Sequence, residues 1–133
     1  MSLLLNKLSL QRKMKETSFL FNIHSNNDFD MAGKIDLLDF MQKNYRRDFS
    51  MSEFAAASGR SLSTFKRDFH KVSALSPERW LTDYRLRASY ELLSRGRRVS
   101  DACFDVGFKN VSHFSAIFKR KFGMTPGQVR KLQ

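Results

Sequence analysis

The chain has 133 residues, 41% of them hydrophobic and 13 of them phenylalanine, which is enough for one ordinary domain or for two small ones that share an element. Lysine and arginine number 24 against 13 acidic residues, and the formal net charge of +11 indicates a polyanionic partner, either nucleic acid or an anionic membrane surface. The single cysteine, Cys103, excludes an internal disulfide and a cysteine-based zinc site, and it is typical of a reducing compartment.

The first thirty residues give weak signals. Leucines and phenylalanines in residues 3–21 allow a helix, and residues 22–30 are polar and turn-rich, as in a linker. The apolar start is interrupted at Asn6 and Lys7 and is too short to cross a bilayer. We therefore expect a cytoplasmic protein.

Apolar residues at helical spacing predict the next elements. A helix is expected from about Ile35 to Asn44, and a short one from about Met51 to Ser58, which Gly59 ends. Ser61 is a good N-cap for the helix that follows. The buried face of that helix is assigned to Leu62, Phe65, Phe69 and Val72.

Ser76 and Pro77 are typical of a helix start, and they predict a longer helix to about Ser94 that Gly96 ends. Its expected apolar stripe is Trp80, Leu81, Tyr84, Ala88 and Leu92. Two further helices are expected at about 100–106, before Gly107, and at 110–122, with Asn110 as the cap. No stretch shows the period of two that marks a strand, so the predicted fold is all-α, with about seven helices.

The strongest pattern is an internal repeat. The equivalent pairs 49 residues apart are Ser63 and Ser112, Phe65 and Phe114, Phe69 and Phe118, Lys71 and Arg120, Ser76 and Thr125, and Pro77 and Pro126. Upstream the offset is 48, which relates Ala55 to Cys103 and Gly59 to Gly107, so the second copy has one extra residue within 108–110. Two copies of short helix, glycine turn and capped helix predict two helix-turn-helix units joined by one helix.

A helix that enters the major groove of DNA needs one apolar face and one face of small polar and cationic residues. In the first copy the outward residues are Ser63, Lys66, Arg67 and His70, and in the second they are Ser112, His113, Ala116, Lys119 and Arg120, opposite Phe114, Phe118 and Phe122. An arginine such as Arg67 can fork onto guanine O6 and N7. The connecting helix, roughly 25 Å long at 1.5 Å per residue, is of the right order to hold the two units one DNA turn apart.

These motifs resemble a known family. VSDACFDVGF (99–108), followed by Ser112, Phe114, Phe118 and GMTPGQVR (123–130), is similar to the C-terminal signature of AraC/XylS-type transcription regulators. FAAASGRS (54–61) and the residues after it resemble the family's first helix-turn-helix and linker helix. The resemblance implies a bacterial DNA-binding domain that binds promoter DNA, is expected to activate transcription, and recruits or regulates RNA polymerase.

Carried over by position, the resemblance assigns base contacts to Ser63, Lys66, Arg67, Val111, Ser112, His113 and Ala116. Phosphate contacts are expected from Ser61, His70, Lys71, Asn110, Lys119, Arg120 and Lys121. Three positions depart from the family pattern: Ala116 lacks a long polar side chain, Ala74 replaces a glycine, and Val129 replaces a tyrosine. The short side chain of Ala116 suggests that the second helix positions the protein more than it specifies a sequence.

The expected organisation is an N-terminal linker or the end of an upstream regulatory or dimerisation domain (1–33), followed by a DNA-binding domain (34–133). That domain divides into a first helix-turn-helix at about 34–76, a linker helix at 77–94, a second helix-turn-helix at 99–122 and a C-terminal helix at 126–132. Self-association would then reside in the upstream domain of a longer regulator.

No catalytic constellation, metal-ligand spacing or phosphate loop is present, so neither an enzyme nor a cofactor is expected. Cys103, Trp80 and Arg85 are interpreted as structural residues. Two alternatives stay open at this point: a basic amphipathic binder of membrane surfaces, and a nucleoid-type protein that binds DNA without sequence preference.

Overall fold

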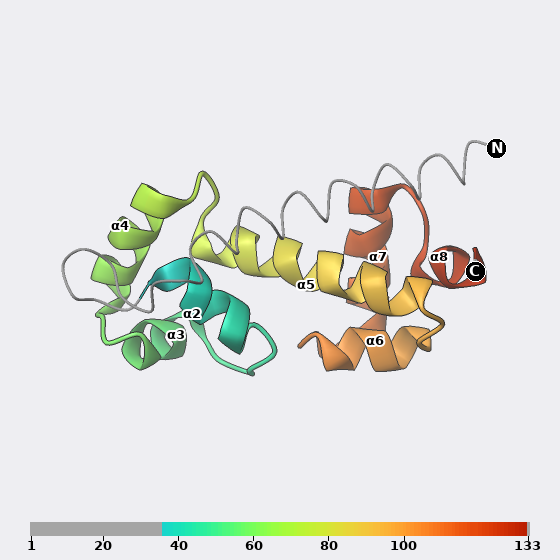
Figure 1. Ribbon diagram of the computed structural model, residues 1–133, viewed down its shortest axis with the longest axis horizontal. Helices are drawn as coiled ribbons and strands as arrows, with labels where there is room; N and C mark the ends of the chain where they lie inside the picture. Colours follow the sequence, from blue (N-terminus) through green and yellow to red (C-terminus); the bar gives the residue numbers. More distant parts are fainter. Residues whose placement is uncertain (1–35, 133) are drawn as a thin grey trace. The chain divides into compact units, whose positions relative to one another are not determined.

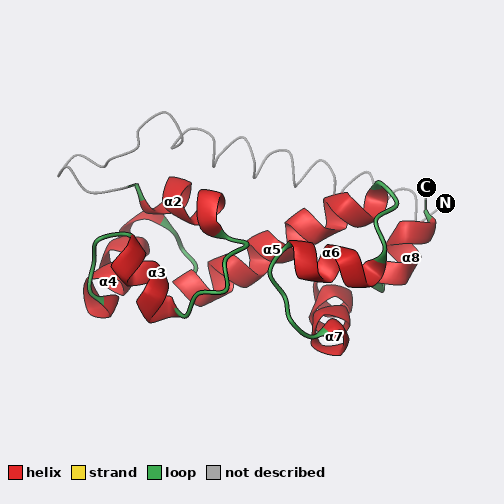
Figure 2. Ribbon diagram, turned by 90° about the horizontal axis from the view of Figure 1, so that it is seen from below, coloured by secondary structure: helices red, strands yellow, loops and turns green. Residues whose placement is uncertain are grey.

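The computed structural model describes residues 36–132. These residues form seven helices and no strand (Figure 2), which confirms the all-α prediction. In chain order the helices are α2 (Leu37–Asn44), α3 (Met51–Ala57), α4 (Leu62–Val72), α5 (Pro77–Ser94), α6 (Val99–Asp105), α7 (Val111–Phe122) and α8 (Pro126–Lys131). The helix expected in 3–21 and the linker expected in 22–30 lie outside the described residues.

The helix starts follow from local side-chain caps. The Ser61 hydroxyl accepts a hydrogen bond from the Thr64 amide at 3.3 Å, and the Asn110 side chain accepts one from the His113 amide at 2.9 Å. Both caps were predicted, because serine and asparagine satisfy amides that the first helical turn leaves unpaired. Reciprocal capping boxes at Ser50 and Thr125 begin α3 and α8 in the same way.

The two turns between paired helices confirm the inserted residue. Four residues separate α3 from α4 and five separate α6 from α7, and the extra one follows Gly107. Gly107 has φ +105°, and a Cβ atom at this position would lie 2.9 Å from Nε of Arg85. Glycine is therefore required here both for the backbone conformation and for the close approach of the arginine.

The two recognition-helix candidates end differently. Gly123, which follows α7, has a left-handed conformation with φ +76°, whereas Ser73, which follows α4, is extended. The Ser73 hydroxyl then accepts a hydrogen bond from the Leu75 amide at 3.1 Å. Ala74 stands where the family pattern has a glycine. It does not need a left-handed conformation, because no non-glycine residue in 36–132 has a positive φ.

The described chain divides into two compact units, and the division falls between Thr82 and Asp83, inside α5. In the first unit α2 and α3 pack on α4 and the start of α5 contributes Trp80, which meets Phe69 edge to face at a ring-centroid distance of 6.1 Å (Figure 1). The buried apolar residues of this unit are Leu37, Leu38, Phe40, Met41, Phe54, Ala55, Phe65, Phe69, Trp80 and Leu81.

The second unit comprises the remainder of α5 with α6, α7 and α8 (Figure 1). Its core is one cluster formed by Leu86, Tyr90, Leu93, Ala102, Cys103, Phe114, Phe118, Phe122, Met124 and Val129. Val129, which replaces the tyrosine of the family pattern, is fully buried in this cluster. No helix in 36–132 is long and apolar enough to cross a membrane.

Two sequence-based assignments of buried faces need correction. Val72 is 45% exposed rather than buried, because α4 ends at this residue and the chain turns away at Ser73. Leu62 is only half-buried.

The single stripe expected along α5 is also wrong in part. Trp80 and Leu81 are buried as predicted, but Tyr84, Ala88 and Leu92 are only half-buried. The buried apolar residues farther along α5 are Leu86, Tyr90 and Leu93, at positions i, i+4 and i+7. The start of α5 packs in the core of the first unit and the remainder packs in the core of the second. Each part of the helix therefore has its own buried apolar face.

Candidate nucleic-acid interface

Helix α4 has two chemically different faces. Phe65 and Phe69 are fully buried, whereas Ser63, Lys66 and Arg67 are exposed, as the sequence predicted. His70 and Lys71 near the end of the helix are exposed as well, and so is the cap residue Ser61. The apolar face anchors the helix in its unit, and the polar and cationic face is left for a ligand.

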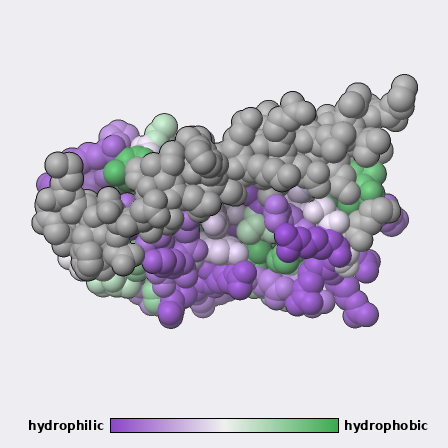
Figure 3. All heavy atoms as spheres, viewed as in Figure 1, coloured by the Kyte–Doolittle hydropathy of each residue, from purple (hydrophilic) through white to green (hydrophobic). Residues whose placement is uncertain are grey.

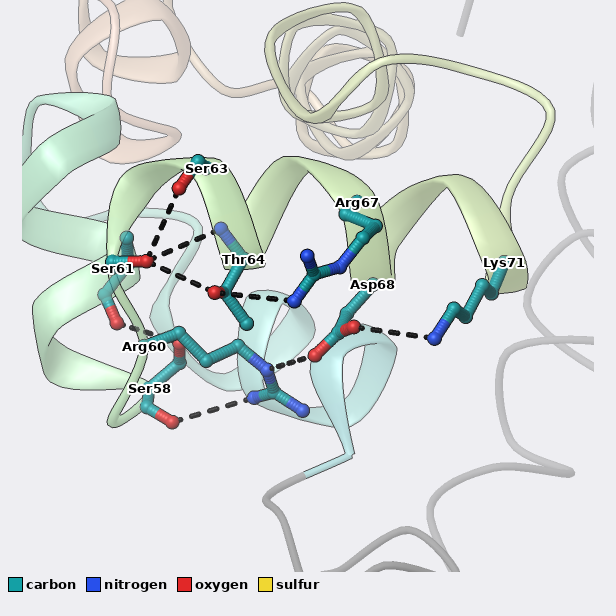
Figure 4. A network of polar contacts seen from close by, with 9 residues as sticks. Ser58, Arg60, Ser61, Ser63, Thr64, Arg67, Asp68 and Lys71 are labelled. Atoms are coloured by element: carbon teal, nitrogen blue, oxygen red, sulfur yellow. Dashed lines mark hydrogen bonds and ion pairs between the residues drawn. The ribbon is translucent and has the colours of Figure 1, made fainter.

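A nearly buried ion pair fixes the turn before α4 to the helix (Figure 4). Nε of Arg60 lies 2.9 Å from an Asp68 carboxylate oxygen, and the Arg60 side chain is only 3% exposed. The Arg60 guanidinium also donates to the Ser58 carbonyl oxygen at 3.4 Å, and Lys71 approaches the other Asp68 oxygen at 3.6 Å. Sequence reasoning missed this pair, because eight residues separate its members and no local pattern marks them.

The exposed face of α4 carries its own polar contacts. The Arg67 guanidinium donates to the Thr64 hydroxyl at 3.5 Å, and this hydroxyl also contacts the cap Ser61 at 3.0 Å (Figure 4). Lys66 lies 4.0 Å from the Glu78 carboxylate, and both side chains are about half exposed. These contacts are long or solvent-exposed, so little free energy is lost when the side chains leave them to bind another anion.

Helix α7 repeats this division of faces. Phe114 and Phe118 are fully buried and Phe122 nearly so, and each of these rings contacts the next along the helix. Tyr90 of α5 stacks on Phe118 and meets Phe122 at ring-centroid distances of 6.2 and 4.9 Å. Aromatic contacts of this kind stabilise the orientation of α7 beyond what apolar burial alone provides.

The outward residues of α7 are smaller than those of α4. Ser112, His113 and Ala116 are exposed, whereas Val111 is half-buried. Ala116 offers only a methyl group at the middle of this face. The outer surface of α7 is therefore suited to close approach and to apolar contact rather than to long hydrogen-bonding side chains.

The basic run at the end of α7 is not uniform. Lys119 and Arg120 are exposed, and Asn110 is exposed at the other end of the helix. Lys121 is exposed as well, but its ammonium contacts the carboxylate of Asp83 on α5. Hydrophilic side chains predominate on the described surface shown in Figure 3.

Cys103 is fully buried in the core of the second unit, and burial raises the pKa of its thiol. Both properties make it unreactive, in agreement with the structural role expected for it.

Residues 54–132 match the sequence profile of a family described as "Helix-turn-helix domain". A transcriptional regulator from Chromobacterium violaceum, described as an AraC-type DNA-binding domain-containing protein, has the same fold, with a TM-score of 0.63. The chain belongs to the AraC/XylS-type helix-turn-helix family. The family consists of DNA-binding transcription regulators rather than enzymes.

Curated relatives match about 70% of this chain and are themselves longer than the matched part. The virulence regulon transcriptional activator VirF of Yersinia enterocolitica is 36% identical over 95 residues, which are 71% of this chain and 35% of VirF. The regulator ExsA of Pseudomonas aeruginosa is 32% identical over 93 residues, or 69% of this chain and 34% of ExsA. The chain spans about a third of the length of these relatives.

Solved structures agree on the AraC-type fold at low sequence identity. The Chromobacterium violaceum protein is 23% identical, and the alignment covers 71% of this chain and 86% of that one. The DNA-binding domain of AdpA, a global transcriptional factor solved in complex with a target DNA, has a TM-score of 0.67 at 23% identity and covers 72% of this chain and 87% of its own.

Proposed function

We propose that this chain binds double-stranded DNA sequence-specifically, with α4 in one major groove and α7 in the next. The observation that carries the proposal is the division of faces on both helices. Each has a buried phenylalanine stripe on one side and exposed serine, histidine or cationic residues on the other. Membrane binding would require neither two copies of this arrangement nor the capped turns that precede them.

The proposed base contacts of α4 come from Ser63, Lys66 and Arg67. Arg67 is suited to guanine, because its guanidinium can donate two parallel hydrogen bonds to O6 and N7. The proposed base contacts of α7 come from Val111, Ser112, His113 and Ala116, with Ala116 against a thymine methyl group. We therefore expect α4 to supply most of the sequence discrimination.

The proposed phosphate contacts lie at the ends of the two helices. They are Ser61, His70 and Lys71 around α4, and Asn110, Lys119 and Arg120 around α7. Lys121, which the sequence also assigns to a phosphate, is left out because its ammonium contacts Asp83. Such contacts set the register of the protein on the duplex and contribute affinity without sequence preference, and that affinity falls as salt concentration rises.

By analogy with relatives named as transcriptional activators and regulators, we propose that the chain is the DNA-binding part of a bacterial regulator that activates transcription. Contact with RNA polymerase and self-association of a longer regulator are part of the same proposal, as is an upstream domain before residue 34. Transcription assays with purified polymerase on a selected binding site would test the proposed contact with RNA polymerase. Binding to the selected site without stimulation of transcription would contradict the proposed role as an activator.

Selection of bound sites from a pool of random duplexes tests the DNA proposal. A bipartite motif with half-sites about ten base pairs apart is the expected result, with the half-site under α4 more sharply defined than the one under α7. Enrichment of no motif despite tight binding would favour the nucleoid-type alternative. Binding to anionic vesicles but not to duplexes would favour the membrane alternative.

The Arg67→Ala variant tests the assignment of base contacts. We expect a loss of about 1–3 kcal/mol at the selected site and relaxed preference at one base pair. Arg95→Ala is the matched control, because Arg95 is an exposed arginine of the α5 terminus paired with Glu91 at 3.2 Å. An equal loss on selected and random DNA for Arg67→Ala would contradict the base-reading role.

A further inference from the structure

One carboxylate on α5 contacts two cations in the second unit. Asp83 accepts a hydrogen bond from Nε of Arg87 at 2.8 Å, one helical turn further along α5. Its second oxygen contacts the Lys121 ammonium at the end of α7. The side chains of Lys121 and Arg87 are each 26% exposed, and that of Asp83 is 24% exposed.

Partial burial makes this group more than a solvated surface pair. Ion pairs that are shielded from solvent are weakened less by water and salt than fully exposed pairs are. The Lys121 ammonium also lies 5.6 Å from the centre of the Phe122 ring, a cation–π contact. To reach a DNA phosphate, Lys121 would have to give up both contacts.

Lys119 and Arg120 differ from Lys121 in this respect. All three residues of the run Lys119-Arg120-Lys121 are exposed, but Lys119 and Arg120 form no ion pair within residues 36–132. Because consecutive helical residues are 100° apart, the three cations cannot all face the same partner. The Lys121 ammonium lies beside Asp83 of α5, whereas Lys119 and Arg120 project from other sides of α7.

We propose that Asp83 is a positioning residue that keeps Lys121 away from the DNA backbone. This inference rests on the DNA-binding function proposed above. Lys119 and Arg120 then supply the phosphate contacts at this end of α7, and Asp83 limits the part of the affinity that is independent of sequence. Restraining one cation therefore lowers the sequence-independent affinity and its dependence on salt concentration.

Salt dependence measures this restraint directly. Each phosphate neutralised by a cation contributes about 0.9 to the slope of log K against log salt concentration on duplex DNA. Over a change from 50 to 200 mM salt, one such contact corresponds to about a three- to fourfold difference in affinity. A purely structural role for Asp83 would not move this slope.

The experiment compares four proteins on a random-sequence duplex across a salt series: wild type, Lys121→Gln, Asp83→Asn and the double variant. Lys121→Gln should leave the wild-type slope unchanged. Asp83→Asn should tighten binding and steepen the slope by about one unit, and Lys121→Gln should reverse this in the Asp83→Asn background. Lys119→Gln is the matched control, and it should flatten the slope by about one unit in both backgrounds.

Several outcomes would overturn the inference. A flatter slope for Lys121→Gln in the wild-type background would mean that this lysine already contacts a phosphate. Tighter binding of Asp83→Asn that Lys121→Gln fails to reverse would mean that Asp83 acts only by repelling the backbone. If Asp83→Asn does not fold, the comparison of Lys121→Gln with Lys119→Gln still tests whether Lys121 contacts a phosphate, and equal flattening by both variants overturns the inference.

The outcomes also distinguish this inference from the proposed function. Wild-type protein that shows no salt-dependent binding to any duplex would remove the DNA-binding proposal itself. Steep wild-type salt dependence that Lys121→Gln and Lys119→Gln reduce equally would leave DNA binding in place and remove only the restraint.

Discussion

Replacing Gly107 by alanine should destabilise the second unit by about 2–3 kcal/mol. The left-handed backbone at φ +105° costs an L-residue about 1–2 kcal/mol. In addition, the new Cβ atom would lie 2.9 Å from Nε and 3.0 Å from Cζ of Arg85. The guanidinium would have to move, and the loss of its present interactions adds about 1 kcal/mol.

The measurement is urea unfolding followed by far-ultraviolet circular dichroism, with Gly123→Ala as the control. Gly123 belongs to the same unit and has φ +76°, but a Cβ atom there would meet nothing within 4 Å. The control should therefore show only the backbone part, about 1–2 kcal/mol. In an Arg85→Ala background, Gly107→Ala should become as mild as the control. Equal losses for the two glycines in the wild-type background would refute the reasoning, because Arg85 would then move aside at no cost.

Three further predictions concern the cores. Phe69→Ala should cost about 3–5 kcal/mol of unfolding free energy, whereas Val72→Ala, three residues later on the same helix, should change it by no more than about 0.5 kcal/mol; similar losses would mean that Val72 is buried after all. Tyr90→Phe should leave stability in urea unchanged or increase it, because the buried Tyr90 hydroxyl has no hydrogen-bond partner within residues 36–132, and a clear loss would reveal one. Cys103 should react with a thiol reagent only as fast as the protein unfolds, since burial shields the sulfur and raises its pKa; rapid reaction of the native protein would contradict this.

The helix boundaries could be predicted because their signals are local. Ser61 and Asn110 cap the helices that follow them, and Gly59 and Gly107 take the positive φ that the intervening turns require. Each signal needs only the residues within one helical turn of it. The extra residue of the second turn was visible for the same reason, since it shifts the repeat from an offset of 48 to one of 49.

Burial was harder to predict, because it depends on where the chain goes next. Val72 continues the apolar spacing of Phe65 and Phe69, but α4 ends there and leaves it exposed. Tyr90, the α5 residue that packs against the phenylalanines of α7, was absent from the expected stripe. The expected stripe assumes one buried face along the whole of α5, whereas the two halves of this helix contribute to two different cores.

The polar contacts of the candidate interface could not be derived from spacing. Lys121 and Asp83 are 38 residues apart, and nothing in the run Lys119-Arg120-Lys121 distinguishes its last member. Only the tertiary arrangement of α5 and α7 shows which cation has a carboxylate beside it. The exposure of the other cations was predictable, because the buried phenylalanines determine the opposite face.

Helix α5 has a consequence for dividing the chain into fragments. The boundary between the two units lies inside this helix, so separating them would interrupt a run of backbone hydrogen bonds and not a loop. A fragment ending at Thr82 would keep only Pro77–Thr82 of α5, a length at which an isolated helix is marginal in water. It would also depend on that frayed segment to present Trp80 and Leu81 to its core. Fragments that each retain the whole of α5 should therefore be more soluble and more cooperative in unfolding than fragments cut at the boundary.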